Sequence, residues 1–154
     1  MKHPLILEVN GESHEIAVEA SATLLHVLRE DLNLIGPKKG CDSGGCGCCT
    51  ILLDGRAVYS CMVFAMSAQG KKITTIEGLP QDGKLDPLQE AFIQSGAVQC
   101  GYCTSGMIMT AKEFLANSPA PGDQEIRRAI SGNLCRCTGC HKTINAIRAA
   151  ASSR

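Results

Sequence analysis

Eight of the ten cysteines in this chain fall into two groups whose spacing suits metal coordination. In the first group, Cys41, Cys46 and Cys49 share one short stretch and Cys61 follows later, giving the order C-x4-C-x2-C and a distant fourth thiol. This is the plant-type spacing for a [2Fe–2S] cluster. Three thiolates are expected to come round the cluster from one tight loop, and the fourth to approach from another strand. The pattern therefore predicts a cluster held by these four cysteines.

Glycines interleave with these thiols, at Gly40, Gly44, Gly45 and Gly47. They permit positive φ angles and let backbone N–H groups approach the sulfurs, which stabilises a negatively charged cluster. Zinc remains an alternative because it also takes four thiolates, although structural zinc usually pairs two C-x2-4-C knuckles. Disulfides would require an oxidising compartment. Cys48 falls outside the ligand spacing, and we interpret it as a small packing residue.

The second group combines a C-x2-C pair, Cys100 and Cys103, with a C-x-C pair, Cys135 and Cys137. Each pair lies beside the start of a predicted helix, where unpaired N–H groups and the helix dipole favour negative charge. The two pairs together predict a second [2Fe–2S] site. Cys140 is an alternative ligand, because it forms a zinc-like C-x2-C pair with Cys137 and is followed by a histidine.

Residues 1–77, which contain the first group of cysteines, are predicted to form strands and one helix. Alternating apolar residues predict strands near residues 5–9 and 14–18 joined by a turn at Asn10-Gly11, a hairpin about Asp54-Gly55, and a closing strand within 71–79. Leucines at helical spacing predict a helix over 21–32, capped by Ser21 and ended by Gly36-Pro37. Residues 1–77 therefore form a small mixed sheet crossed by a helix.

From residue 78 onward the pattern changes to helical periodicity. Residues 78–86 are rich in Gly and Pro and read as a linker. Four helices are predicted after it, over residues 87–96, 104–118, 123–133 and 142–151. Helices this short must pack as a bundle to persist. The methionines Met62, Met66, Met107 and Met109 are interpreted as core residues.

Composition excludes several classes of function. The formal net charge is zero, aromatic residues make up 3% and Trp is absent, which argues against nucleic-acid binding and against a polybasic membrane patch. No stretch is long and apolar enough to insert into a membrane, and the N-terminus does not read as a secretory signal. Clustered thiols then point to a reducing compartment, and we expect a cytoplasmic location.

Three motifs give the chain a resemblance along its whole length. GCDSGGCGCC followed by Cys61, then QCGYCTSGM, then GNLCRCTG together resemble the small iron–sulfur subunit or domain of the xanthine oxidase family of molybdenum hydroxylases. The resemblance implies an α+β chain, with an N-terminal β-grasp domain like plant-type ferredoxins over 1–77, a linker over 78–86 and a C-terminal four-helix bundle over 87–154. Two positions depart from the family pattern, where Ser105 replaces a frequent Pro and Cys140 a frequent Tyr.

The resemblance also implies roles for individual residues. One cluster, distal to molybdenum and near a flavin, would be ligated by Cys41, Cys46, Cys49 and Cys61. The other, proximal to molybdenum, would be ligated by Cys100, Cys103, Cys135 and Cys137. Gln99 and Cys137 would lie beside the pterin of the molybdenum cofactor.

The function expected from these observations is electron transfer. The chain would relay single electrons through two [2Fe–2S] clusters, between the molybdenum cofactor of a large subunit and FAD on a flavin-binding subunit or another acceptor, with no substrate chemistry of its own. The alternatives are a free-standing diffusible ferredoxin and a zinc-binding interaction module. A neutral chain suits a permanent complex better than transient docking steered by charge. The substrate is not predicted, because its pocket would belong to the large subunit.

Overall fold

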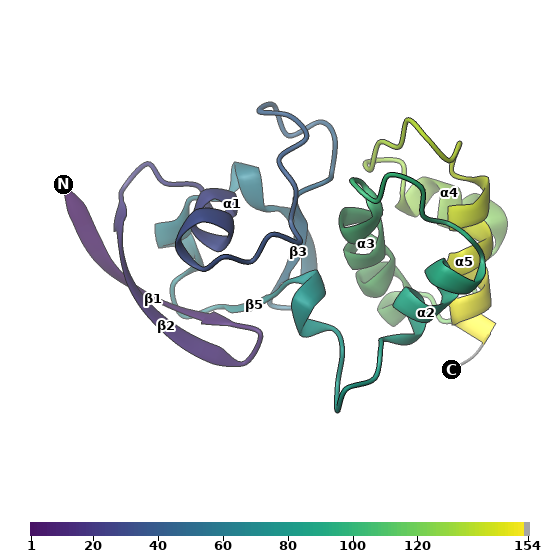
Figure 1. Cartoon of the computed structure of the whole chain (residues 1–154), viewed down its shortest axis with the longest axis horizontal. Helices are drawn as coiled ribbons and strands as arrows, with labels where there is room; N and C mark the ends of the chain where they lie inside the picture. Colours follow the sequence, from purple (N-terminus) through teal and green to yellow (C-terminus); the bar gives the residue numbers. More distant parts are fainter. Residues whose placement is uncertain (153–154) are drawn as a thin grey trace.

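The fold is α+β, with a sheet in the N-terminal half and helices in the C-terminal half (Figure 1). The computed structural model describes residues 1–152. One mixed sheet has the order β2-β1-β5-β3-β4. Its strands are β1 (Lys2–Val9), β2 (Glu12–Glu19), β3 (Thr50–Leu53), β4 (Arg56–Tyr59) and β5 (Lys72–Thr74).

Both predicted hairpins are confirmed. β1 pairs antiparallel with β2 around Asn10-Gly11, and β3 pairs antiparallel with β4 around Asp54-Gly55. All four turn residues have positive φ angles, which Asn, Asp and Gly tolerate best. The closing strand is shorter than predicted, because β5 ends at Thr74 and a 3-10 helix, η4 (Ile76–Gly78), follows. β5 runs parallel to β1 and antiparallel to β3, so it joins the two hairpins.

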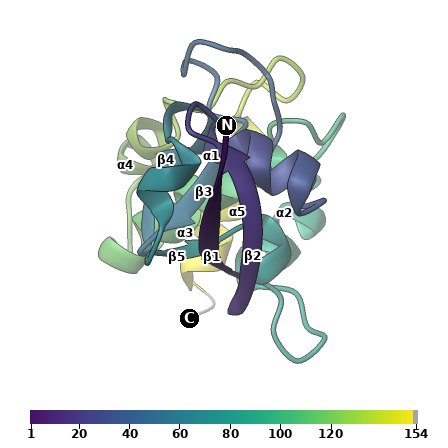
Figure 2. The same ribbon diagram turned by 90° about the vertical axis from the view of Figure 1, so that its left-hand side faces the viewer.

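The first helix differs from the prediction in its start and in its shape. α1 (Leu24–His26) continues as a π-helical segment, η1 (Val27–Asp31), beside the sheet (Figure 2). The predicted cap at Ser21 is wrong. The cap is Thr23, whose side-chain oxygen accepts from the N–H of His26 at 3.3 Å. Two later 3-10 turns, η2 (Ser60–Met62) and η3 (Ala65–Ala68), connect β4 to β5.

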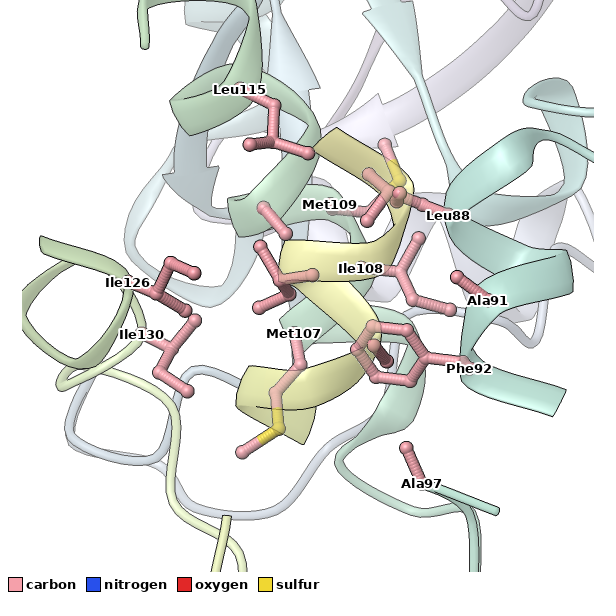
Figure 3. Close-up of a cluster of buried hydrophobic side chains, with 14 of the residues drawn as sticks. Leu88, Ala91, Phe92, Ala97, Met107, Ile108, Met109, Leu115, Ile126 and Ile130 are labelled. Atoms are coloured by element: carbon pink, nitrogen blue, oxygen red, sulfur yellow. The ribbon is translucent and has the colours of Figure 1, made fainter. Parts of the chain in front are cut away.

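Four helices make up the C-terminal half, namely α2 (Pro87–Gln94), α3 (Thr104–Asn117), α4 (Asp123–Ala129) and α5 (His141–Ser152). They pack around one apolar cluster that includes Phe92, Met107 and Ile126 (Figure 3). α2 starts in a capping box between Asp86 and Gln89. α4 ends four residues before the predicted 133, because the chain there turns toward the sheet. Within residues 1–152, no helix combines the length and apolarity that crossing a bilayer requires.

β3 separates two apolar cores. Ile51 belongs to the core between the sheet and α1, whereas Leu52 belongs to the core of the helical half. Adjacent residues of a strand point to opposite faces, so one short strand serves both cores. Of the methionines predicted to be internal, Met107 and Met109 are buried. The prediction is wrong for Met62, which is 64% exposed.

Candidate metal centres

The first cysteine group occupies the loop between η1 and β3, together with the turn after β4. Cys49 is buried at the start of β3, and Cys61 lies in η2. Their sulfur atoms are 3.4 Å apart although the residues are 12 positions apart in sequence. The Cys46 thiol lies between those of Cys41 and Cys48 and interacts with both. Cys61 therefore reaches the loop from the 3-10 turn that follows β4, and not from a strand as expected.

Glycines make this loop possible in two different ways. Gly44 and Gly47 have φ angles of 69° and 71°, which favour glycine. Gly40 does not have a positive φ. Instead, a Cβ at Gly40 would lie 3.0 Å from the Cys46 sulfur and 3.2 Å from the Cys48 sulfur. Side chains at these positions would strain the backbone or push the thiols aside.

Backbone amides converge on the exposed end of the first group. They lower the pKa of Cys41 to about 6, mainly through hydrogen bonds from the backbone of Ser43, then from the Cys46 thiol and the backbones of Cys46 and Gly45. Burial acts in the opposite direction at Cys61 and raises its pKa to about 12, together with the neighbouring Cys49 thiol. One side of the group thus favours thiolate and the other is shielded from water.

The second cysteine group is assembled from two loops that are far apart in sequence. Cys100 lies before α3 and Cys103 is the residue that caps α3, while Cys135 and Cys137 lie between α4 and α5. The sulfurs of Cys100 and Cys137 are 3.4 Å apart. Cys103 and Cys135 are joined by a side-chain hydrogen bond. The structure therefore brings these four cysteines together, as the pairs Cys100–Cys137 and Cys103–Cys135 and not as the two sequence-adjacent pairs. Their role as ligands stays a prediction.

Hydrogen bonds also favour thiolate in the second group. Burial would raise the pKa of Cys135, but hydrogen bonds from the Thr138 hydroxyl and backbone N–H outweigh it and lower the value to about 7. Thr138 lies 3.0 Å from the Cys135 sulfur through its hydroxyl and 3.3 Å through its nitrogen. The pKa of Cys100 is lowered mainly by a hydrogen bond from the backbone of Tyr102. Burial raises the pKa of Cys103 to about 12.

The arrangement of both groups fits a cluster with two irons. In a [2Fe–2S] cluster each iron is bound by two protein thiolates, and each group here contains one close sulfur pair, Cys49–Cys61 or Cys100–Cys137, with the other two predicted ligands beside it. Over residues 1–152, no three His, Cys, Asp or Glu side chains surround the position of a single metal ion. The donor set of eight thiols, backed by amide donors, suits soft iron–sulfur chemistry.

Two cysteines lie outside the predicted ligand sets. Cys48 is 5% exposed, and burial, followed by a hydrogen bond with the Cys46 thiol, raises its pKa to about 12. Cys140 has a φ of 63° and packs against the core of the helical half, and burial raises its pKa as well. Gln99 is exposed directly beside Cys100. Its predicted contact with a pterin concerns a partner molecule and stays a prediction.

Residues that sequence reasoning missed hold the two groups next to each other. The Tyr102 hydroxyl donates to the Lys39 carbonyl at 2.7 Å, and the Ser105 hydroxyl donates to the Gly36 carbonyl at 2.7 Å. A Cβ at Gly106 would lie 2.2 Å from the Gly47 carbonyl oxygen, so α3 contacts the first cysteine loop directly. The motifs gave one usable signal, because Tyr102, Ser105 and Gly106 all lie within QCGYCTSGM.

Comparisons with known proteins agree with this geometry. Residues 7–76 match the family described as "2Fe-2S iron-sulfur cluster binding domain", and residues 75–148 match the family described as "[2Fe-2S] binding domain". The chain is 49% identical to the nicotinate dehydrogenase small FeS subunit of Eubacterium barkeri, over 92% of this chain and 90% of that protein. It is 45% identical to the aldehyde oxidoreductase iron-sulfur-binding subunit of Escherichia coli, over 96% of this chain and 71% of that protein.

A solved structure extends the similarity to three dimensions. The crystal structure of quinoline 2-oxidoreductase from Pseudomonas putida 86 contains a chain that superposes with a TM-score of 0.95 at 45% sequence identity. The superposition covers 99% of this chain and 95% of that chain. The two chains therefore share one fold over nearly their whole length.

Proposed function

We propose that this chain, which belongs to the small [2Fe–2S] subunits of the xanthine oxidase family of molybdenum hydroxylases, ligates two clusters through eight of its cysteines. The chain is an electron-transfer subunit of an oxidoreductase complex and not a free ferredoxin. One ligand set is Cys41, Cys46, Cys49 and Cys61, and the other is Cys100, Cys103, Cys135 and Cys137. The pairing of sulfurs in both groups carries this assignment.

Each bound cluster supplies one-electron redox chemistry. Hydrogen-bond donors of this chain would stabilise the negative charge of a bound cluster. Backbone N–H groups around Cys41 and the Thr138 hydroxyl and N–H at Cys135 donate hydrogen bonds to ligand sulfurs. Cys103 sits at the N-terminus of α3, where the helix dipole also favours negative charge. These donors stabilise the reduced state and so help to set the potential at each site.

The second group is proposed to face the molybdenum pterin of a large partner subunit. Cys100 and Cys137 are exposed at this site, and Gln99 lies beside them. Apolar side chains are exposed close by in sequence, with Val98 at 42% and Leu134 at 61%. Apolar surface beside exposed ligands supports a protein interface here. Gln99 can both donate and accept hydrogen bonds, as a pterin edge requires.

The first group is proposed to face the electron acceptor, FAD on a flavin-binding subunit in the simplest arrangement. Met62 and Phe64 follow Cys61 in the chain and are 64% and 60% exposed. A Cβ at Gly44 would lie 2.9 Å from the Met62 sulfur, so Met62 covers the cysteine loop itself. Apolar surface is thus exposed beside both cysteine groups. This supports a relay in which electrons enter from one partner subunit and leave to another.

The finer description of the fold belongs to the same proposal. We assign residues 1–77 to a β-grasp domain, 78–86 to a linker and 87–154 to a four-helix bundle, of which residues 153–154 lie outside the described part of the chain. The order β2-β1-β5-β3-β4 and the shared core of α2, α3, α4 and α5 support these assignments. We also keep the cytoplasm as the proposed location, because clustered thiols suit a reducing compartment.

The substrate is proposed to be recognised by the partner and not by this chain. The relatives named above act, by their names, on nicotinate, an aldehyde and quinoline, yet their identity to this chain stays between 45% and 49%. Proteins named for such different substrates match this chain over 92% to 99% of its length, so the chain is suited to the step they have in common, which is electron transfer.

The assignment is tested by chemical analysis of the full chain, purified without air and supplied with iron and sulfide. We expect about four irons and four sulfides per chain, with two distinguishable [2Fe–2S] signals in the electron paramagnetic resonance spectrum after reduction. One signal with about half that iron, or stoichiometric zinc in place of iron, would contradict it.

A further inference from the structure

The carbonyl oxygen of Gly47 accepts hydrogen bonds from donors in both halves of the molecule. It accepts a hydrogen bond from the Thr50 N–H at 3.2 Å and from the Thr50 hydroxyl at 2.6 Å. A third donor, the side-chain nitrogen of Asn133, approaches at 2.9 Å from 86 residues away. The same nitrogen lies 3.4 Å from the Thr50 hydroxyl oxygen. Asn133 is only 5% exposed.

The residues on either side of Asn133 are bonded to the sheet half as well. The Leu134 N–H donates to the Cys46 carbonyl at 2.8 Å, and the Gly132 carbonyl accepts from the Tyr59 hydroxyl at 2.9 Å. The approach is close, since a Cβ at Gly47 would lie 2.4 Å from the Gly132 oxygen. Three consecutive residues are therefore held against the loop of the first cysteine group.

The position of this contact along the chain matters for both clusters. Gly47 lies between the ligands Cys46 and Cys49, and Asn133 lies two residues before the ligand Cys135. A hydrogen bond between Asn133 and Gly47 thus connects the backbone of one ligand loop to the backbone of the other. The buried amide of Asn133 keeps this hydrogen bond formed, because leaving polar groups unpaired away from water is costly.

We propose that Asn133 is a positioning residue, whose buried amide holds the ligand loop of Cys46 and Cys49 against the segment leading into Cys135 and so fixes the separation and orientation of the two clusters. This inference rests on the proposed ligand sets. One-electron transfer between two centres depends steeply on their separation, so a contact at this place bears on the rate of the relay.

The test uses Asn133→Leu in the full chain, with Asn117→Leu as the control. Leu is similar in size to Asn but cannot donate. Asn117 makes its hydrogen bond to the Glu113 carbonyl on an exposed part of α3. Both clusters are reduced, and electron paramagnetic resonance measures how far magnetic coupling between the clusters splits their signals. Iron and sulfide content are measured on the same samples. We expect unchanged iron, a changed splitting in Asn133→Leu and the wild-type splitting in Asn117→Leu.

A second variant covers the case in which Asn133→Leu does not assemble its clusters. Thr50→Val keeps the shape of the side chain and removes the hydroxyl that contacts both Gly47 and Asn133. We expect a smaller change of splitting in the same direction. A wild-type splitting in Asn133→Leu overturns the proposal. If that variant lacks clusters, a wild-type splitting in Thr50→Val overturns it instead.

Hydrogen exchange separates this proposal from the ligand assignment. In Asn133→Leu, the segment containing the Leu134 amide should exchange about fivefold faster or more by mass spectrometry, whether or not clusters are present. Faster exchange in a protein that never binds two clusters would support the contact and refute the proposed function. Unchanged exchange in Asn133→Leu would refute the role of Asn133 itself.

Discussion

The two cysteine groups differ in how much of their enclosure this chain provides. In the first, three of the four cysteines come from one glycine-rich loop, and Cys49 is only 2% exposed. In the second, the cysteines come from two loops, and both Cys100 and Cys137 are exposed. A ligand left open to water in one subunit is suited to being covered by another. The first site is thus closed largely by its own loop, whereas the second is left open on this chain.

The largest effect is expected from removing a ligand of the enclosed site. Cys46→Ser should abolish the first cluster and lower the iron content by about half, because the other cluster has its own four thiolates. Cys48→Ser is the matched control, since its thiol is buried next to Cys46 but outside the ligand pairs. Iron and sulfide analysis decides, and an equal loss of iron in both variants would refute the first ligand set.

The same comparison applies to the open site. Cys135→Ser should remove the second cluster and leave the first, as seen in the two reduced-state spectra. Cys140→Ser should retain both, because Cys140 packs against the helical core and joins no thiol pair of the second group. Loss of the second signal in Cys140→Ser would show that the C-x2-C pair formed by Cys137 and Cys140 is the true ligand pair.

A smaller effect is expected where the two sites meet. Gly47→Ala should lower the free energy of unfolding by about 3 kcal/mol, because it adds the cost of a positive φ to an overlap with the Gly132 oxygen. Gly45→Ala should be nearly neutral, since its Cβ would meet only the Ser43 hydroxyl oxygen, at 3.8 Å. Thermal or denaturant unfolding of both variants measures the difference. Equal stability of the two variants would mean that the backbone around Gly47 shifts to accommodate the added Cβ.

The smallest effect is expected at the exposed edge of the second site. Gln99→Leu should leave both clusters assembled but slow their reduction by substrate in the reconstituted complex by about fivefold, the equivalent of one hydrogen bond. Reduction by dithionite should stay normal, because it does not pass through the pterin. An unchanged rate with substrate would remove Gln99 from the path.

The success of sequence reasoning differed between local and distant features. Both hairpins could be predicted, and so could the membership of the two cysteine groups, because turn residues and spacing motifs act within a few positions. Which sulfurs lie next to each other could not, since Cys100 and Cys137 are 37 positions apart. The contact between Asn133 and Gly47 could not, since it joins residues 86 apart and an isolated Asn has many possible partners. The π-helical η1 was missed because leucine periodicity reports an apolar face and not the hydrogen-bonding pattern. Met62 was misread because hydrophobicity alone does not distinguish a core from an interface.

The position of β3 between two cores has a consequence for how the chain matures. Ribosomes deliver the sheet before the helices, and at that stage Ile51 can already pack, whereas the partners of Leu52 in the helical half have not been synthesised. The nascent sheet thus carries an uncovered apolar face, the kind of surface that chaperones bind and that drives aggregation. The sheet half is therefore expected to reach its final packing only after the helical half has been synthesised.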